Sequence, residues 1–217
     1  MPSKNILITG NSRGLGQCLS LLFESKGFQV FGLHRDIVDL ADTPSVKNYT
    51  NYLSQFHFDT IIINAATVGI EIDDNYHDIW SSSCEELFKI NFLNQIRMLH
   101  TLIPKIEKNI IFITSRIGSF NRYKNQLTYE FPFRKLIYAS TKISLNHISS
   151  YYAKTNPKLK VYSIAPGSLN NEFEGKYTKK KNRITIRESA ESIYEIISNR
   201  TQPSGSFLNY DGFEHPL

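Results

Sequence analysis

Cysteine is scarce in this chain: Cys18 and Cys84 are its two copies, and they form neither a Cys-x-x-Cys pair nor a metal-ligand spacing. We therefore expect no disulfide framework and no metal site. Long apolar runs are also lacking, since none approaches the roughly 20 residues that span a bilayer, and the N-terminus shows no signal-peptide pattern. These absences predict a cytoplasmic protein that does not enter a membrane.

The charge balance gives only a weak indication of partners. The net charge is +5, but the basic residues are scattered except at 176–183, so nucleic-acid binding is a minor alternative and we expect none. No internal repeat, low-complexity segment or linker divides the 217 residues. The sequence therefore predicts one globular domain, 1–217, with a sizeable core.

Apolar runs that are typical of strands alternate with helical patterns along the chain. The strands are expected at 5–9, 29–33, 60–64, 110–114, 161–164 and 206–209, and the helices at 14–26, 45–56, 82–106, 136–154 and 187–198. This alternation predicts an α/β fold, a Rossmann-like doubly wound parallel sheet.

One connection is too short for that pattern. A parallel crossover needs a dozen or more residues, yet only about three separate Leu33 from a possible strand at 37–39. We infer that the crossover helix after the second strand is shortened or missing. Residues 36–40 then either follow the sheet edge or form a stub, and the sheet is smaller than the standard one.

The glycine-rich turn of residues 9–16 follows the first expected strand and opens the first helix. Its glycines, Gly10, Gly14 and Gly16, are spaced to bring backbone N–H groups and a helix N-terminus against a pyrophosphate. Because glycine turns also serve packing, the motif alone is weak. It nevertheless predicts a dinucleotide site.

Polar residues recur where later strands and helices would face this turn. The third strand ends at Asn64, Ala65 and Ala66, the fourth ends at Ser115, and Asn91 lies within a helix. Tyr138 and Lys142 stand one helical turn apart. A second Tyr-x-x-x-Lys pair, Tyr177 and Lys181, lies in a lysine-rich segment and has no such partners.

Together these motifs resemble the short-chain dehydrogenase/reductase family over nearly the whole chain, and in particular its small carbonyl-reductase and C-factor-like branch. The resemblance implies NADP(H)-linked hydride transfer with a carbonyl or alcohol substrate. It identifies four catalytic residues: Asn91, Ser115, Tyr138 and Lys142. It implies a cofactor site made of Gly10, Ser12, Arg13, Gly14, Leu15, Gly16, His34, Arg35, Asp39, Leu40, Asn64, Ala65, Ala66, Tyr138, Lys142, Pro166 and Gly167.

The implied chemistry is physically reasonable. A tyrosine with its usual pKa near 10 is a poor base, and a lysine ammonium beside it, together with an oxidised nicotinamide, would favour the phenolate. Tyr138 would then be the general acid/base. Ser115 would hold the substrate oxygen, Lys142 would contact the ribose, and Asn91 would anchor a water that links Lys142 to solvent.

The residues after the second strand predict NADP rather than NAD. NAD-specific folds place an acidic residue there, whereas this chain has His34 and then Arg35, with Arg13 in the glycine turn. Arginines can pair with a 2′-phosphate. A register shift of two residues would instead make Asp36 the ribose acid and favour NAD.

Several departures and rival interpretations stay open. Ile63, Ala66 and Asn170 differ from the family's usual residues, and an aromatic-rich insertion at 116–135 lines the substrate site or an interface. Residues 168–186 are predicted to form a substrate lid, and the family implies a homodimer or homotetramer. The rivals are a dinucleotide-binding regulatory protein with incidental activity, and a reductase of a nucleotide-sugar or carrier-bound substrate.

Overall fold

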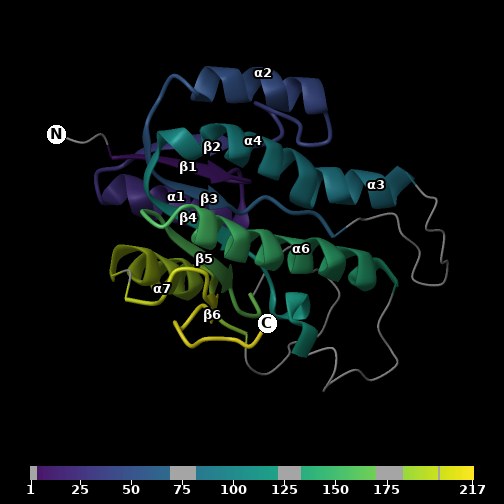
Figure 1. Ribbon diagram of the computed structural model, residues 1–217, viewed down its shortest axis with the longest axis vertical. Coiled ribbons are helices and arrows are strands. Elements are labelled where there is room, and N and C mark those ends of the chain that lie inside the picture. Colours follow the sequence, from purple (N-terminus) through teal and green to yellow (C-terminus); the bar gives the residue numbers. More distant parts are fainter. Residues whose placement is uncertain (1–3, 69–81, 122–132, 170–182, 200) are drawn as a thin grey trace.

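The computed structural model describes residues 4–68, 82–121, 133–169, 183–199 and 201–217 (Figure 1). Its centre is one sheet of parallel strands in the order β2-β1-β3-β4-β5-β6. The strands are β1 (Asn5–Thr9), β2 (Gln29–Leu33), β3 (Phe58–Ile63), β4 (Ile106–Ile113), β5 (Lys160–Ala165) and β6 (Phe207–Asn209). The predicted parallel sheet and all its expected strands are confirmed.

Helices cover both faces of the sheet (Figure 1). They are α1 (Gly14–Ser25), α2 (Thr43–Leu53), α3 (Ser82–Phe88), the π-helical turn η1 (Lys89–Leu93), α4 (Asn94–Leu102), the short η2 (Ile103–Lys105) and η3 (Arg116–Gly118), α6 (Phe133–Thr155) and α7 (Ile186–Asn199). Successive residues of a strand point to opposite faces, so each buried strand contributes to two cores. One core lies under α1 and α7, and the other under α2, α4 and α6.

In the connection from β2 to β3, no helix follows β2 directly, as the sequence predicted, and the helix α2 comes only afterwards. Between Leu33 and α2 the chain makes turns only, with the N–H groups of Ile37 and Val38 both donating to His34 O at 2.9 Å. Of the two alternatives for residues 36–40, neither an edge strand nor a strand stub forms. Val38 and Leu40 instead bury their side chains in the core beside α2, and β2 is left as an edge of the sheet.

The predicted long helix at 82–106 is continuous but not uniform. It runs through α3, the π turn η1 and α4, so one extra residue is accommodated within the turn that carries Asn91. Such π bulges are often found at functional sites. They cannot be read from the 3.6-residue periodicity, which is why the sequence predicts a plain helix here.

Substitution of a buried leucine of α4 tests this architecture directly. Leu99 of α4 is fully buried, whereas Leu21 of α1 is 61% exposed. We expect Leu99→Ala to lower the free energy of unfolding by about 2–5 kcal/mol, because it removes buried carbons and leaves a cavity. Leu21→Ala should cost less than about 0.5 kcal/mol. Urea denaturation of both variants checks this, and equal losses would contradict the described packing.

Candidate active site

The carboxyl ends of the parallel strands meet at one edge of the sheet, where ligands bind in open α/β folds. The turn after β1 is shaped by its glycines. Gly10 has φ +69° and approaches β3 so closely that a Cβ would lie 2.7 Å from Ala65 Cα. At Gly16 a Cβ would collide with Gly10 O and lie 2.6 Å from Asn64 Nδ2. Neither position can take a side chain unless the backbone moves.

The N-terminus of α1 differs from that of α2 in how its N–H groups are capped. The N-cap residue of α1 is Arg13, which gives no side-chain cap, and the first turn carries no acidic residue. In α2 the Asp42 carboxylate accepts from Ser45 N at 3.2 Å. The partial positive charge of α1 is therefore not neutralised by a cap, as an anion site requires.

Thr9 ties the glycine-rich turn to the end of β3. Its hydroxyl accepts hydrogen bonds from Asn64 N and Ala65 N, both at 2.9 Å, and donates to Gln95 Oε1 at 2.7 Å. The resemblance assigns Asn64 to the cofactor site. Its amide nitrogen donates to Thr9 O at 2.9 Å and Gly10 O at 3.2 Å. Asn64 thus lies at the predicted edge, with its amide nitrogen used to hold the turn.

Lys142 brings α6 to the end of β4. The side chain is 2% exposed, and Nζ donates to Ile113 O at 2.9 Å, two residues before Ser115. The same Nζ lies 5.6 Å from the ring centre of Tyr138. Ser115 caps η3 by accepting from Ile117 N at 3.3 Å. A Cβ at Gly118 would touch the backbone of Lys142, so η3 packs directly on α6.

Asn91 reaches the same place from the π turn. Its side chain is fully buried, and it pairs with the backbone of Thr67 through Oδ1 to N at 2.7 Å and Nδ2 to O at 2.8 Å. Nδ2 also lies 3.3 Å from Thr141 Oγ1, next to Lys142 in sequence. The structure therefore brings the π turn that carries Asn91 and the helix that carries Tyr138 and Lys142 to the carboxyl end of β4, just before Ser115.

Burial shifts the pKa values of the tyrosine and the lysine in opposite directions. Loss of solvent raises the pKa of Tyr138 to about 12 and lowers the pKa of Lys142 to about 8. We expected the neighbouring ammonium, together with an oxidised nicotinamide, to lower the pKa of Tyr138. In the protein without a cofactor this pKa is raised. Desolvation disfavours both charged forms, phenolate and ammonium, and it is the dominant cause for each.

The residues after β2 lie at the other end of this edge. Arg35 is exposed and its Nε is 3.8 Å from Asp39 Oδ2, while Asp39 Oδ1 accepts from Ala41 N at 2.9 Å. His34 Nδ1 lies 3.5 Å from the exposed Asp36 carboxylate. Leu15 and Leu40, both expected near a cofactor, direct their side chains into the cores, so only their backbones face the edge.

The loops after β5 are described in part. Gly167 has φ +84°, and Pro166 O accepts from Ser189 Oγ at 2.8 Å. Leu169 and Ile184 form an isolated parallel bridge that holds the ends of the predicted lid together. Residues 170–182, with Tyr177, Lys181 and Asn170, and residues 122–132 of the predicted insertion lie outside the described residues.

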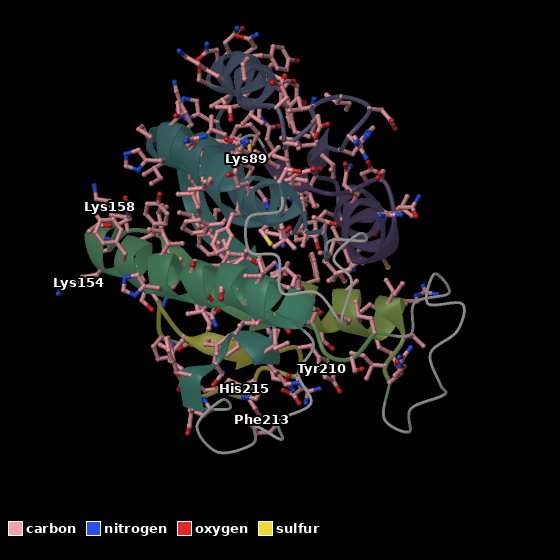
Figure 2. The ribbon with its side chains drawn as sticks, turned by 90° about the vertical axis from the view of Figure 1, so that its right-hand side faces the viewer. Lys89, Lys154, Lys158, Tyr210, Phe213 and His215 are labelled. Carbon is pink, nitrogen blue, oxygen red and sulfur yellow. The ribbon has the colours of Figure 1, made fainter. Side chains whose placement is uncertain are left out.

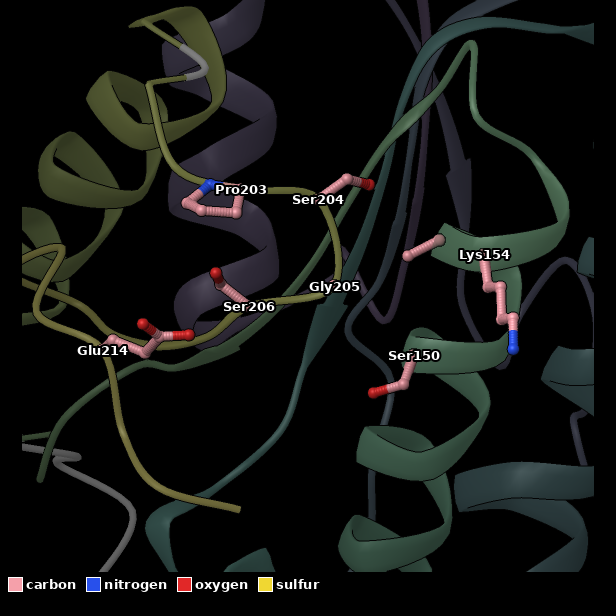
Figure 3. A pocket seen from close by; sticks show the side chains of 8 residues that line it. Ser150, Lys154, Pro203, Ser204, Gly205, Ser206 and Glu214 are labelled. Atoms are coloured by element: carbon pink, nitrogen blue, oxygen red, sulfur yellow. The ribbon is translucent and has the colours of Figure 1, made fainter.

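A hollow of about 370 Å³ lies elsewhere, between the end of α6 and the turn before β6 (Figure 3). Ser150, Lys154, Gly205 and Glu214 are among its lining residues. It is at the amino ends of the strands, and Ser150 stands roughly 18 Å along α6 from Tyr138. Figure 2 likewise shows Lys154 and Lys158 at this far end of α6, away from Lys89. This hollow is separate from the candidate site.

Two absences can be reported for the described part of the chain. Among these residues, no group of three or more histidine, cysteine, aspartate or glutamate side chains could hold a metal ion. No helix there is long and apolar enough to cross a membrane.

Solved structures of other proteins have a similar fold. The structure superposes on a short-chain dehydrogenase/reductase from Burkholderia multivorans with bound NADP, with a TM-score of 0.78, 22% identity and full coverage of both chains. The chain has the short-chain dehydrogenase/reductase fold. A carbonyl reductase from Pseudomonas aeruginosa (TM-score 0.77, 19% identity, 99% of this chain and 100% of that one) and an NADPH-bound carbonyl reductase from chicken fatty liver (0.76, 17%, all of both chains) share it.

A curated relative supports the same resemblance from sequence. The 3-oxoacyl-(acyl-carrier-protein) reductase FabG of Buchnera aphidicola is 26% identical in an alignment of 186 positions, which covers 70% of this chain and 75% of that protein. No family model matches the chain. The resemblance to short-chain dehydrogenases/reductases, predicted from the sequence motifs, is confirmed, and the small carbonyl-reductase branch fits.

Sequence reasoning missed several residues that build this candidate site. Thr67, Gln95 and Thr141 hold the segments that carry the expected residues. Thr9 belongs to the recognised glycine motif, but its role in joining β1 to β3 was not anticipated. Gln95 belongs to no motif, because its partners are backbone groups that only the fold brings together.

The lowered pKa of Lys142 predicts how stability depends on pH. Between pH 8 and 10.5 an unfolded lysine still binds a proton that the folded one has released, so stability rises with pH there. The wild type should gain up to about 3 kcal/mol in free energy of unfolding over this range. Lys142→Met should lack this gain. Urea titrations at pH 7.5 and 10 measure it, and parallel changes in both proteins would contradict the lysine's described burial.

Proposed function

We propose that the protein is an NADP-linked oxidoreductase that interconverts a carbonyl compound and an alcohol. The observation that carries the proposal is that the segments carrying Asn91, Ser115, Tyr138 and Lys142 meet at the end of β4, joined by the Lys142–Ile113 and Asn91–Thr141 hydrogen bonds. The short-chain dehydrogenase/reductase fold and its relatives support the same assignment. The substrate site would lie between this point and the loops after β4 and β5.

The residues fit a nicotinamide dinucleotide. The turn of Gly10 and Gly16 has no room for side chains, and the uncapped N-terminus of α1 offers N–H groups to a pyrophosphate. Asp39 and Leu40 would face the adenine, Ala65 and Ala66 the ribose, and Pro166 and Gly167 the nicotinamide. When bound, the nicotinamide would supply or accept the hydride at the substrate carbon.

The chain's own residues would handle the proton and the oxygen. In the reducing direction, Tyr138 donates its phenolic proton to the carbonyl oxygen, and the carbonyl becomes an alcohol. Ser115 donates a hydrogen bond to the same oxygen. Lys142 is held in place by Ile113 O, and its ammonium stabilises the phenolate that remains. A pKa of about 12 for the partly buried Tyr138 keeps it protonated at neutral pH, as a general acid requires.

Removal of the phenol tests this assignment. Tyr138→Phe should lower the rate of reduction at least 100-fold, the size of a general-acid contribution, while NADPH binding stays nearly unchanged because the ring remains. Tyr177→Phe is the matched control and should change little. The measurement is loss of NADPH absorbance across a panel of aldehydes and ketones. An essential Tyr177 with a dispensable Tyr138 would overturn the proposed site.

We propose NADP as the preferred cofactor. His34 is the first residue after β2, and Arg35 follows it with an exposed guanidinium. Its 3.8 Å pairing with Asp39 is exposed and costs little to give up. Solved structures of this fold with bound NADP or NADPH support the choice. Asp36, the acidic alternative, lies three positions past the strand, with its side chain 90% exposed.

Direct titration of the two cofactors decides between them. Two charge-assisted contacts from Arg13 and Arg35, at roughly 1.5–3 kcal/mol each, predict NADPH binding of the order of a hundredfold tighter than NADH. Arg35→Ala should reduce that preference about tenfold or more, and Lys47→Ala on α2 serves as the control. Equal affinities, or tighter NADH, would refute the roles of both arginines.

A carrier-bound substrate is the second candidate. It is favoured by the similarity to FabG, whose name assigns that protein an acyl-carrier-protein substrate. The basic stretch at 176–183 also favours it. If this candidate holds, a 3-oxoacyl group on a carrier protein should be reduced with a lower KM than the same group on a short thioester. That advantage should fall as salt is raised. Equal KM values would remove this candidate and leave a small carbonyl compound.

A further inference from the structure

Two neighbouring amide side chains, Asn94 and Gln95, are completely buried in the first turn of α4. Buried amides are costly unless their donors and acceptors are paired. Both are paired here, and with backbone groups of two different loops at the carboxyl edge of the sheet. None of the catalytic roles described above involves either residue.

Gln95 holds the segment that follows β3. Its Nε2 donates to Ala65 O and Ile90 O, both at 2.8 Å, and its Oε1 accepts from the Thr9 hydroxyl at 2.7 Å. A hydroxyl has one donor and two acceptor positions, and Thr9 uses all three, on Gln95, Asn64 N and Ala65 N. The orientation of the amide is fixed, because the two carbonyls can only accept.

The same segment is held again two residues later. Asn91 pairs with both Thr67 N and Thr67 O. Gln95 bonds to Ile90 O, which precedes Asn91 in the π turn. Gln95 thus connects the glycine-rich turn, the segment 64–67 and the π turn through one side chain.

Asn94 holds the connection that follows β2. Its Nδ2 donates to Leu40 O at 2.8 Å, and its Oδ1 accepts from Arg97 Nη1 at 2.8 Å and Thr43 Oγ1 at 3.2 Å. This connection has no helix or strand of its own between Leu33 and α2. Backbone hydrogen bonds of regular structure therefore do not fix Leu40, and the amide of Asn94 does so instead.

We propose that Asn94 and Gln95 are positioning residues that fix the two walls of the adenosine half of the dinucleotide site. One wall is the 39–40 segment and the other is the 64–66 segment. The inference rests on the proposed function, since it assumes that a dinucleotide lies between them. Backbone already ordered before binding needs no further loss of entropy when the ligand arrives, so the two amides increase affinity without touching the ligand.

Three variants of the full chain test this. Gln95→Leu and Asn94→Leu remove the amides with little change in volume. Asn109→Leu is the control, because Asn109 is also a buried amide, bonded to Thr60 Oγ1 at 2.9 Å, and it stands near the middle of β4. The probe is 2′,5′-ADP, which carries the adenosine and its 2′-phosphate without the nicotinamide. Thermal unfolding of all three variants controls for general loss of stability.

Both α4 variants should bind 2′,5′-ADP at least tenfold more weakly than the wild type, and the control within twofold. The KM for NADPH should rise by a similar factor, while kcat at saturating NADPH stays within twofold. Amides of residues 64–67 should exchange hydrogen faster in Gln95→Leu, and those of residues 38–42 in Asn94→Leu. A purely structural role would instead lower the melting temperature alike in all three variants and leave the affinities equal.

If the leucine variants fail to fold, the hydroxyl of Thr9 provides the test of the Gln95 network. Thr9→Ser keeps the three hydrogen bonds and should keep the affinity for 2′,5′-ADP, whereas Thr9→Val should lose it. If the wild type binds 2′,5′-ADP and the α4 or Thr9→Val variants bind it equally well, the inference about Asn94 and Gln95 is wrong. That result would leave the proposed function standing. A folded wild type that binds neither NADPH nor 2′,5′-ADP would overturn the proposed function and the inference with it.

Discussion

The hydrogen bonds of the Thr9 hydroxyl are the constraint on which the carboxyl edge of the sheet depends. β1 and β3 are neighbours in the sheet, but their paired register ends at Ile8 and Ile62. Beyond that point, Thr9 continues the contact by accepting from Asn64 N and Ala65 N. The narrow fit of Gly10 and Gly16 against Ala65 and Asn64 follows from it. A glycine-rich turn is conformationally free by itself, and here side chains from β3 and α4 fix it.

Burial destabilises the charged forms of both Lys142 and Tyr138. A lysine that is almost fully enclosed, with its pKa lowered to about 8, is close to losing its proton at physiological pH. Its ammonium is favoured by Ile113 O, by the Tyr138 ring and by any negative charge that develops beside it. A phenolate at Tyr138 would be such a charge. Each side chain alone disfavours its charged form, but the ammonium and the phenolate would stabilise each other. Such a pair suits a transient proton transfer.

Much of the fold could be predicted from the sequence, because alternation of apolar runs and helical patterns is a local signal. Even the absence of a helix directly after β2 followed from a residue count between Leu33 and the next apolar stretch. The four candidate catalytic residues came from motif resemblance, and the segments that carry them meet at the carboxyl end of β4. The π turn around Asn91 and the buried amides of Asn94 and Gln95 could not be predicted, since their hydrogen bonds to other loops join residues 24 to 86 positions apart. The dominance of burial over charge at Tyr138 also needed the three-dimensional surroundings.

Backbone amide chemical shifts recorded during addition of NADPH test the central claim most directly. If a dinucleotide binds along the carboxyl edge, the largest changes should fall on residues 10–16, 39–41, 64–67 and 138–142, which the fold brings together there. The hollow at Ser150 and Gly205, at the amino edge, should remain unchanged. Changes confined to that hollow, or no changes at millimolar NADPH, would contradict the account.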